Sequence, residues 1–212
     1  MLHRRDGRST TAHPHRQRAD IDITRFTTSW LVSPSLLSIL RASISLYAFV
    51  VLLTIIGYDR SRGADATVRR SFSYFTVLTY WGLAFYFTFA AAHTASYALA
   101  GRSYLQRWPV ALQRLHAVFY CTITVYPFLV TIVFWSVLSY RALKTRYSTW
   151  SNISEHTLNS AFALFEIALP RTEPPPFIHI VPLLLLLALY LALAYTTYAT
   201  AGIYVYVFLN PR

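Results

Sequence analysis

Cysteine and charge are both scarce in this chain of 212 residues. Its single cysteine, Cys121, excludes a disulfide framework within the chain, and no Cys-x-x-Cys pair or Cys/His cluster suggests a structural zinc site. Only 13% of the residues are Asp, Glu, Lys or Arg, about half the share of a soluble domain, whereas 55% are hydrophobic. This composition argues against a soluble globular enzyme and against a disordered chain.

Acidic residues are fewer than basic ones, 8 against 19, and the formal net charge is +11. The basic residues lie in the first 30 positions and in short segments between long uncharged runs, as expected of loops at a membrane surface. No nucleic-acid-binding motif accompanies them, so we predict no nucleic-acid partner. We interpret residues 1–30 as a basic, disordered tail and residues 31–212 as an integral membrane helix-bundle domain.

Charged residues are missing from four long runs: 42–58, 71–101, 115–140 and 174–211. A helix needs about 20 apolar residues to cross a bilayer. The last three runs meet that length, and the first meets it if Arg41 extends its guanidinium to the interface. A fifth, weaker candidate covers about 150–169, where Glu155, His156 and Glu166 interrupt the apolar pattern.

We therefore predict an all-α fold, a polytopic membrane bundle of about five helices in which a sixth is possible. The predicted helices are Leu36–Ile56, Ser73–Leu99, Leu115–Leu138, Trp150–Leu169 and Phe177–Thr200. A soluble helical core is disfavoured, because a globular helix must present a polar face to water. We predict a multipass membrane protein that is located in the endoplasmic reticulum or the plasma membrane. Its predicted partner is the lipid bilayer.

The fourth predicted helix carries polar residues on one face. At 100° per residue, His156, Asn159, Ala163 and Glu166 fall within an arc of about 80°, which predicts that this stripe faces the bundle interior. Glu166 lies about 15 Å along the helix from His156, which is too far to orient that imidazole directly. We therefore predict that Glu166 is protonated or pairs with another helix. Ionisable groups at membrane depth indicate function by default.

A hydroxyl and an imidazole are predicted at the same depth of the bundle. The second and fourth helices run in the same direction, and Thr76 and His156 lie near their starts. A threonine hydroxyl needs an adjacent base to act as a nucleophile, and neutral histidine is the usual base. Equal depth permits this pair without showing contact, because Thr76 and the nearby Thr79 could equally bond their own helix backbone.

Three segments resemble the androgen-induced protein family, which includes the androgen-dependent TFPI-regulating protein. Residues 74–78 (YFTVL) resemble a Tyr-Leu-Thr-Phe-Leu element that begins a membrane helix. Residues 152–157 (NISEHT), with Phe162 and Glu166, resemble an Asn-His-x-x-His-Thr element, with Ile153 in place of its first histidine. Residues 202–209 (GIYVYVFL) resemble the terminal Gly-x-x-Val-Tyr-x-Phe-Leu.

The resemblance implies a membrane-embedded threonine hydrolase of fatty-acid esters of hydroxy fatty acids or similar lipid esters. Matched by motif, its nucleophile corresponds to Thr76 and its base to His156. We add Asn159, on the same helix face as His156, as a candidate substrate-binding residue that could form an oxyanion hole. Such chemistry requires no metal or organic cofactor, and its partners are the lipid bilayer and a lipid ester substrate.

Two other interpretations stay open. A non-catalytic membrane protein could bind lipids or act as a scaffold, with His156 and Glu166 as buried structural groups. A metal-dependent lipid hydrolase would use His93, His116 and His156 with Glu166, although no His-x-x-x-His spacing supports it.

Overall fold

The computed structural model describes residues 22–139 and 142–211. Residues 1–21 of the predicted tail lie outside the described residues. Within these ranges the fold is an all-α bundle, as predicted, and only an isolated bridge between Ser29 and Pro170 has β geometry. The helices are α1 (Pro34–Ser61), α2 (Asp65–Ser71), α3 (Phe75–Ala100), α4 (Tyr104–Arg107), α5 (Val110–Val133), α6 (Arg146–Ile153), α7 (Asn159–Ala168) and α8 (Ile180–Ala201).

Two π-helical segments interrupt the regular helices. The segment η2 (Phe134–Leu138) continues α5, and η4 (Ser154–Leu158) joins α6 to α7. A π-helical turn inserts an extra residue into the helix and often marks a functional site. His156 lies in the second of these segments, so the predicted base stands at a local break in the backbone hydrogen-bond pattern.

Local sequence signals set several helix ends. Ser33 caps α1 by accepting a hydrogen bond from the Leu36 N–H, and Pro34 takes the first helical position, where no amide hydrogen is needed. Helices α3 and α8 both end at a glycine in the left-handed conformation, Gly101 at φ 66° and Gly202 at φ 67°. Only glycine adopts that conformation readily, so the chain can leave each helix sharply.

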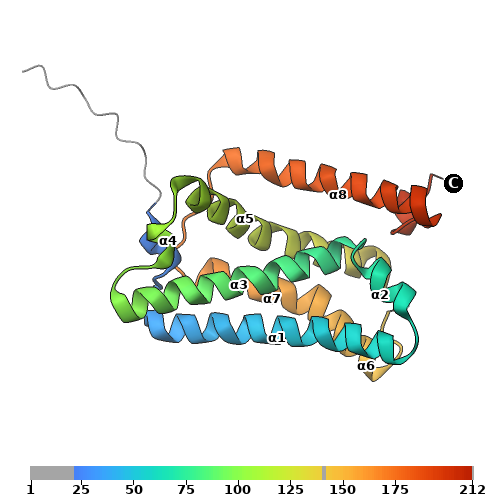
Figure 1. Ribbon diagram of the computed structural model, residues 1–212, viewed down its shortest axis with the longest axis horizontal. Coiled ribbons are helices and arrows are strands. Elements are labelled where there is room, and N and C mark those ends of the chain that lie inside the picture. Colours follow the sequence, from blue (N-terminus) through green and yellow to red (C-terminus); the bar gives the residue numbers. More distant parts are fainter. Residues whose placement is uncertain (1–21, 140–141, 212) are drawn as a thin grey trace, which may run out of the picture.

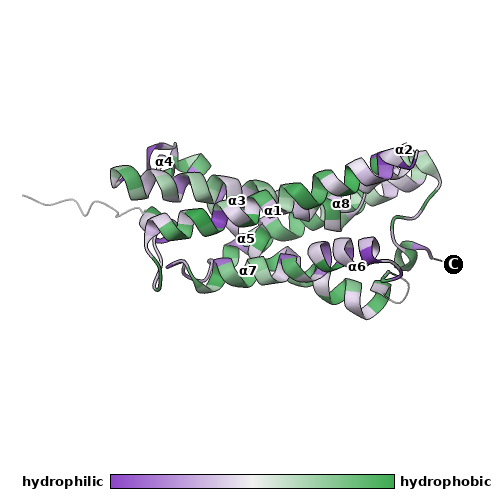
Figure 2. Ribbon diagram, turned by 90° about the horizontal axis from the view of Figure 1, so that it is seen from below, coloured by the Kyte–Doolittle hydropathy of each residue, from purple (hydrophilic) through white to green (hydrophobic). Residues whose placement is uncertain are grey.

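Four helical stretches are long and apolar enough to cross a membrane: Pro34–Ser61, Phe75–Ala100, Val110–Leu138 and Phe177–Ala201. They coincide with four of the five predicted helices within a few residues. The shortest has 25 residues and would extend about 37 Å, which exceeds the roughly 30 Å of a bilayer core. Figure 2 shows that hydrophobic residues cover these helices along most of their length.

The fifth predicted helix also forms, continuously from α6 through η4 to α7. It is not one of the four stretches that are long and apolar enough to cross a membrane. It lies along α5 and within the same bundle as α1 and α3 (Figure 1). The predicted stripe faces inward, as the exposed fractions show: 8% for His156, 2% for Asn159, 0% for Ala163 and 0% for Glu166.

Helices α1 and α3 pack closely along their length, and serine hydroxyls link their backbones. Ser38 donates to the Ala91 carbonyl at 3.0 Å, and Ser45 donates to the Ala84 carbonyl at 3.0 Å. Small residues at the contact allow the backbones to approach, and such hydrogen bonds are typical of helix pairs in membranes.

A buried ion pair ties α1 to α7. Arg41 is fully buried and forms a two-pronged contact with Glu166, through Nε to Oε2 at 3.0 Å and Nη2 to Oε1. Tyr86 donates to the same carboxylate at 2.9 Å, and Arg41 also donates to the Thr94 hydroxyl and the Phe26 carbonyl. The condition that Arg41 extends its guanidinium to the interface is therefore not met, because the guanidinium is buried in the bundle. Glu166 supplies a charged partner inside the bundle, and pairing there avoids an unpaired buried charge.

Helix α8 stands at the edge of the bundle, along α5 (Figure 1). Much of its surface is apolar and exposed, including Leu184 and Leu185, each at 59%. After Gly202 the chain turns back, so residues 203–209 lie against the N-terminal end of α3 through the contacts of Tyr206 with Tyr74 and Phe75. This return places the C-terminal segment at the same end of the bundle as Thr76.

Candidate functional site

Thr76 lies in the first turn of α3, where amide groups lack partners within the helix. The side chain of the N-cap residue Tyr74 forms no capping hydrogen bond at this end of α3. The Phe75 N–H instead donates to the hydroxyl of Tyr206 at 3.2 Å. Thr79 behaves differently, because its hydroxyl donates to the carbonyls of Phe75 and Thr76 at 2.9 and 3.0 Å. Thr79 is thus held by its own helix and lines a cavity between α3, α5 and α8, whereas Thr76 borders the cavity that His156 also lines.

His156 is held by stacking. Its ring lies parallel to that of Phe134, with the ring centroids 3.7 Å apart and an angle of 2° between the planes. The side chain is 8% exposed, and among the described residues its buried Nδ1 has no hydrogen-bond partner. The stacking defines the ring plane, and the unpartnered nitrogen leaves the imidazole available for a ligand or a proton.

Thr76 and His156 line the same cavity, of about 300 Å³. Its walls come from α3, the two π-helical segments and the C-terminal segment: Tyr74, Thr76, Val77, Phe134, Leu138, Glu155, His156, Val205, Tyr206 and Val207. Within the described ranges, no hydrogen bond joins Thr76 to His156. The fold therefore brings the predicted pair to one cavity. Direct proton transfer from Thr76 to His156 requires the two side chains to come within hydrogen-bond reach when substrate binds.

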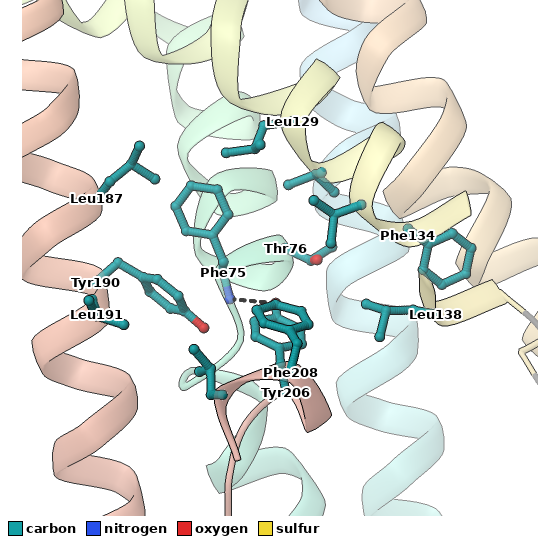
Figure 3. Close-up of a pocket in the computed structure, with 13 residues that line it drawn as sticks. Phe75, Thr76, Leu129, Phe134, Leu138, Leu187, Tyr190, Leu191, Tyr206 and Phe208 are labelled. Atoms are coloured by element: carbon teal, nitrogen blue, oxygen red, sulfur yellow. Dashed lines mark hydrogen bonds between the residues drawn. The ribbon is translucent and has the colours of Figure 1, made fainter. Parts of the chain in front are cut away.

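A second cavity, of about 330 Å³, adjoins the first (Figure 3). The two share Thr76, Phe134, Leu138 and Tyr206. Aliphatic and aromatic side chains from α3, α5, α8 and the C-terminal segment form the rest of its lining: Phe75, Leu129, Val130, Val133, Leu187, Tyr190, Leu191, Phe208 and Leu209. The first cavity, which His156 lines, is the polar chamber of the site, and the second cavity is its apolar chamber. Together they fit an amphipathic ligand with a long hydrocarbon portion.

A network of polar side chains holds the π-helical turn at His156. The Thr131 hydroxyl, on α5, donates to the His156 carbonyl at 2.7 Å. Asn159 donates to the Pro127 carbonyl and accepts a bond from the Ser160 N–H at 2.7 Å. The bonds from Thr131 and Asn159 tie η4 and the start of α7 to α5.

Asn159 does not line the cavity that Thr76 and His156 share. Replacing Asn159 with leucine should lower the free energy of unfolding by about 1–3 kcal/mol, because the Ser160 N–H loses its buried acceptor. The measurement is unfolding in mixed detergent micelles. Ala161→Leu is the matched control, since it introduces the same leucine at an exposed position of α7, and it should change stability by less than about 0.5 kcal/mol. Equal stability of both variants would contradict this role.

Tyr206 is a polar residue of the site to which sequence reasoning assigned no role. Its hydroxyl accepts the Phe75 N–H and is also in hydrogen-bonding contact with Thr76 and with the hydroxyl of Tyr190. Burial raises the pKa of Tyr206, and these hydrogen bonds offset only part of that increase. The phenol therefore keeps its proton at neutral pH. The sequence offered one signal for Tyr206, a residue with a hydroxyl group within the largely apolar C-terminal segment 202–209.

The residues of the metal interpretation do not converge. His93 lies near the end of α3 opposite Thr76, about 26 Å along the helix, and packs against His116 with ring centroids 5.3 Å apart. His156 lies in η4, and Glu166 is bonded to Arg41. In the described part of the chain, no three His, Cys, Asp or Glu side chains come together as a metal site.

Comparison with known proteins identifies no relative: no family model, curated protein or solved structure matches this chain. Membership of the androgen-induced protein family accordingly stays a prediction from the three motifs.

Proposed function

We propose that the protein is a membrane-embedded hydrolase of lipid esters that uses Thr76 as nucleophile and His156 as base. The observation that carries this proposal is the shared cavity, which holds a threonine hydroxyl and a buried imidazole beside an apolar chamber. The resemblance in three motifs supports the same pair of residues. The four long apolar helices support a membrane location, where lipid esters are available.

The proposed reaction proceeds through an acyl-threonine. The Thr76 hydroxyl oxygen bonds to the ester carbonyl carbon while its proton passes to His156, and the carbonyl π electrons move onto the oxygen. Collapse breaks the bond to the alcohol oxygen, which takes the proton from His156. Water then attacks the acyl-threonine with His156 again as base, releasing the fatty acid and restoring the Thr76 hydroxyl.

The apolar chamber indicates the class of substrate. Its hydrogen-bonding side chains are the hydroxyls of Thr76, Tyr190 and Tyr206, and the rest of its lining is hydrocarbon. The chamber therefore suits an unbranched hydrocarbon chain. A further cavity of about 430 Å³ between α3, α5 and α8 shares Phe75 and Tyr190 with it and extends the apolar surface along α8. A long-chain ester, such as a fatty-acid ester of a hydroxy fatty acid, is the proposed substrate.

The decisive test is ester hydrolysis by the purified protein in nanodiscs, over a panel that includes fatty-acid esters of hydroxy fatty acids. Covalent labelling by an alkyl fluorophosphonate measures the nucleophile independently of substrate choice. We expect turnover and labelling that both require Thr76. A folded protein that neither cleaves any ester nor reacts with the probe would reject the hydrolase proposal.

Filling the apolar chamber should change chain-length selectivity. Leu187→Trp adds bulk to the wall of this chamber and should lower kcat/KM for long-chain esters by about 10-fold or more, because one lost methylene site alone costs about 1 kcal/mol or more. Esters of short acids should be hydrolysed almost as before. Leu184→Trp is the matched control, since Leu184 lies on the outer surface of the same helix at 59% exposure. A loss that is equal for short and long chains would argue against an acyl-chain chamber here.

A lipid-binding protein without catalysis is the second candidate. The apolar chamber would hold a hydrocarbon chain equally well without any reaction at Thr76. In that case Thr76→Ala should leave binding of a fluorescent fatty acid unchanged, and the wild type should show no phosphonate labelling.

A further inference from the structure

Tyr206 stands where the two chambers of the site meet. Of the four residues that line both, Phe134 and Leu138 are hydrocarbon, so only Thr76 and Tyr206 present a hydroxyl. Figure 3 shows both residues at this cavity, with the bond from the Phe75 N–H to Tyr206 drawn as a dashed line. An ester carbon placed at Thr76 would have its carbonyl oxygen among the few polar groups at this junction.

The Tyr206 hydroxyl accepts one hydrogen bond from the backbone, and its own proton faces an acceptor that a bound ester oxygen could replace. Its oxygen accepts from the Phe75 N–H at 3.2 Å, so that bond does not use the phenolic hydrogen. Tyr190 donates its only hydroxyl proton to the Ser73 carbonyl at 3.1 Å, so in the contact between the two phenols the Tyr206 hydroxyl is the donor and the Tyr190 oxygen is the acceptor. Donation to an ester requires the Tyr206 hydroxyl to rotate from Tyr190 to the carbonyl oxygen of the ester. A hydroxyl that accepts from an amide is polarised and becomes a stronger donor. Packing of the Tyr206 ring against Tyr74 and Phe208 restricts its movement.

We propose that Tyr206 is a catalytic residue whose hydroxyl donates a hydrogen bond to the carbonyl oxygen of the bound ester. The inference rests on the proposed hydrolase function and adds the group that stabilises the oxyanion. When Thr76 attacks, negative charge develops on that oxygen, and a donor already oriented in a site poor in water stabilises it more than water would. The phenol stays protonated throughout, and the proton from Thr76 still passes to His156.

Position 206 places the donor on a different element from the nucleophile and the base. Thr76 belongs to α3 and His156 to η4, whereas Tyr206 reaches the site only because Gly202 lets the chain turn back after α8. The C-terminal segment thus completes the site instead of only covering it. A turn at Gly202 with φ 67° is strained for any residue with a side chain, which explains why glycine is needed there.

The test compares wild type, Tyr206→Phe and Tyr204→Phe in nanodiscs with the same long-chain ester. Tyr206→Phe keeps the ring and removes the donor, so kcat should fall by about 10²–10³-fold, while KM changes little. Inhibition by an alkyl trifluoromethyl ketone, whose adduct with Thr76 carries an oxyanion, should weaken in parallel. Tyr204 belongs to the same segment, stacks on Tyr198 and lines neither chamber, so Tyr204→Phe should keep wild-type kcat.

A second replacement keeps the hydroxyl and so avoids a loss of folding. Incorporating 3-fluorotyrosine at position 206 makes the phenol a stronger donor and should tighten binding of the trifluoromethyl ketone. Unchanged ketone affinity in that protein, or a Tyr206→Phe protein that is folded and has wild-type kcat, would overturn the proposal. A rise in KM alone would also overturn it, because it would show a role only in ground-state binding. A wild type without ester turnover or phosphonate labelling would instead reject the hydrolase function itself.

Discussion

Replacing Thr76 with alanine should lower ester hydrolysis by about 10³-fold or more, because alanine leaves no atom to form the acyl-enzyme. Labelling by an alkyl fluorophosphonate should disappear in the same variant. His156→Ala should cause a comparable loss, since the hydroxyl is a poor nucleophile without its base. Initial rates in nanodiscs, together with in-gel detection of the labelled protein, measure both effects.

Thr79→Ala is the matched control for the nucleophile. Thr79 lies one turn further along the same helix, but its hydroxyl bonds the backbone of that helix and it lines a different cavity. We expect kcat within about three-fold of wild type, since an intrahelical hydroxyl of this kind makes little net contribution. If Thr79→Ala abolished turnover and Thr76→Ala did not, the nucleophile would be assigned to the wrong residue.

The second large effect concerns the buried ion pair. Glu166→Leu should destabilise the protein by about 3–5 kcal/mol, because it leaves the Arg41 guanidinium buried without its carboxylate and also removes the acceptor of Tyr86. Arg41→Leu should have a similar effect for the reciprocal reason. The fraction folded at increasing concentrations of a denaturing detergent measures these changes.

Two controls separate burial from charge. The double variant Arg41→Leu with Glu166→Leu should recover part of the lost stability, since neither charge then lies unpaired in the interior. The exposed partner of the Arg25–Glu173 pair provides the comparison: Glu173 is 74% exposed, and Glu173→Gln should cost less than about 1 kcal/mol. If Glu166→Leu were no more harmful than Glu173→Gln, the ion pair would not stabilise the bundle.

These two predictions test different parts of the bundle. Thr76 borders a cavity, and within the described residues its hydroxyl has no hydrogen bond to another helix, only the contact with Tyr206 of the C-terminal segment. Thr76→Ala should therefore unfold close to wild type. Glu166 links α7 to α1 and α3 and lines neither chamber. A loss of activity in Thr76→Ala at unchanged stability would therefore report chemistry, whereas a loss in Glu166→Leu would report folding.

The helices were predictable because their cause is local. A run without charge long enough to span a bilayer must satisfy its backbone within itself, and a helix does so from neighbouring residues alone. The four long apolar stretches thus lie within a few residues of their predictions. The short helices α2 and α4 were missed, since seven and four residues carry too little periodic pattern to be recognised.

The position of the candidate pair was partly predictable. Helix direction alone placed Thr76 and His156 at one depth, and the polar stripe of the fourth helix indicated its buried face. That both side chains line one cavity depended on how α3 and η4 pack against α5, and on the stacking of His156 on Phe134. Periodicity places residues on a face of a helix, but it does not say which faces meet.

The sequence by itself determined that this protein is an all-α bundle and located the four helices that are apolar and long enough for a membrane, because uncharged length and turn residues act locally. The fifth predicted membrane helix forms but is not among these four. Only the tertiary structure decided the long-range partners: Glu166 for Arg41, and Tyr206 for the N-terminal turn of α3. Residues 125 and 131 positions apart form these contacts, so their geometry depends on the packing of the whole bundle. The free energy of burying a charge or an amide without a partner then makes each contact necessary.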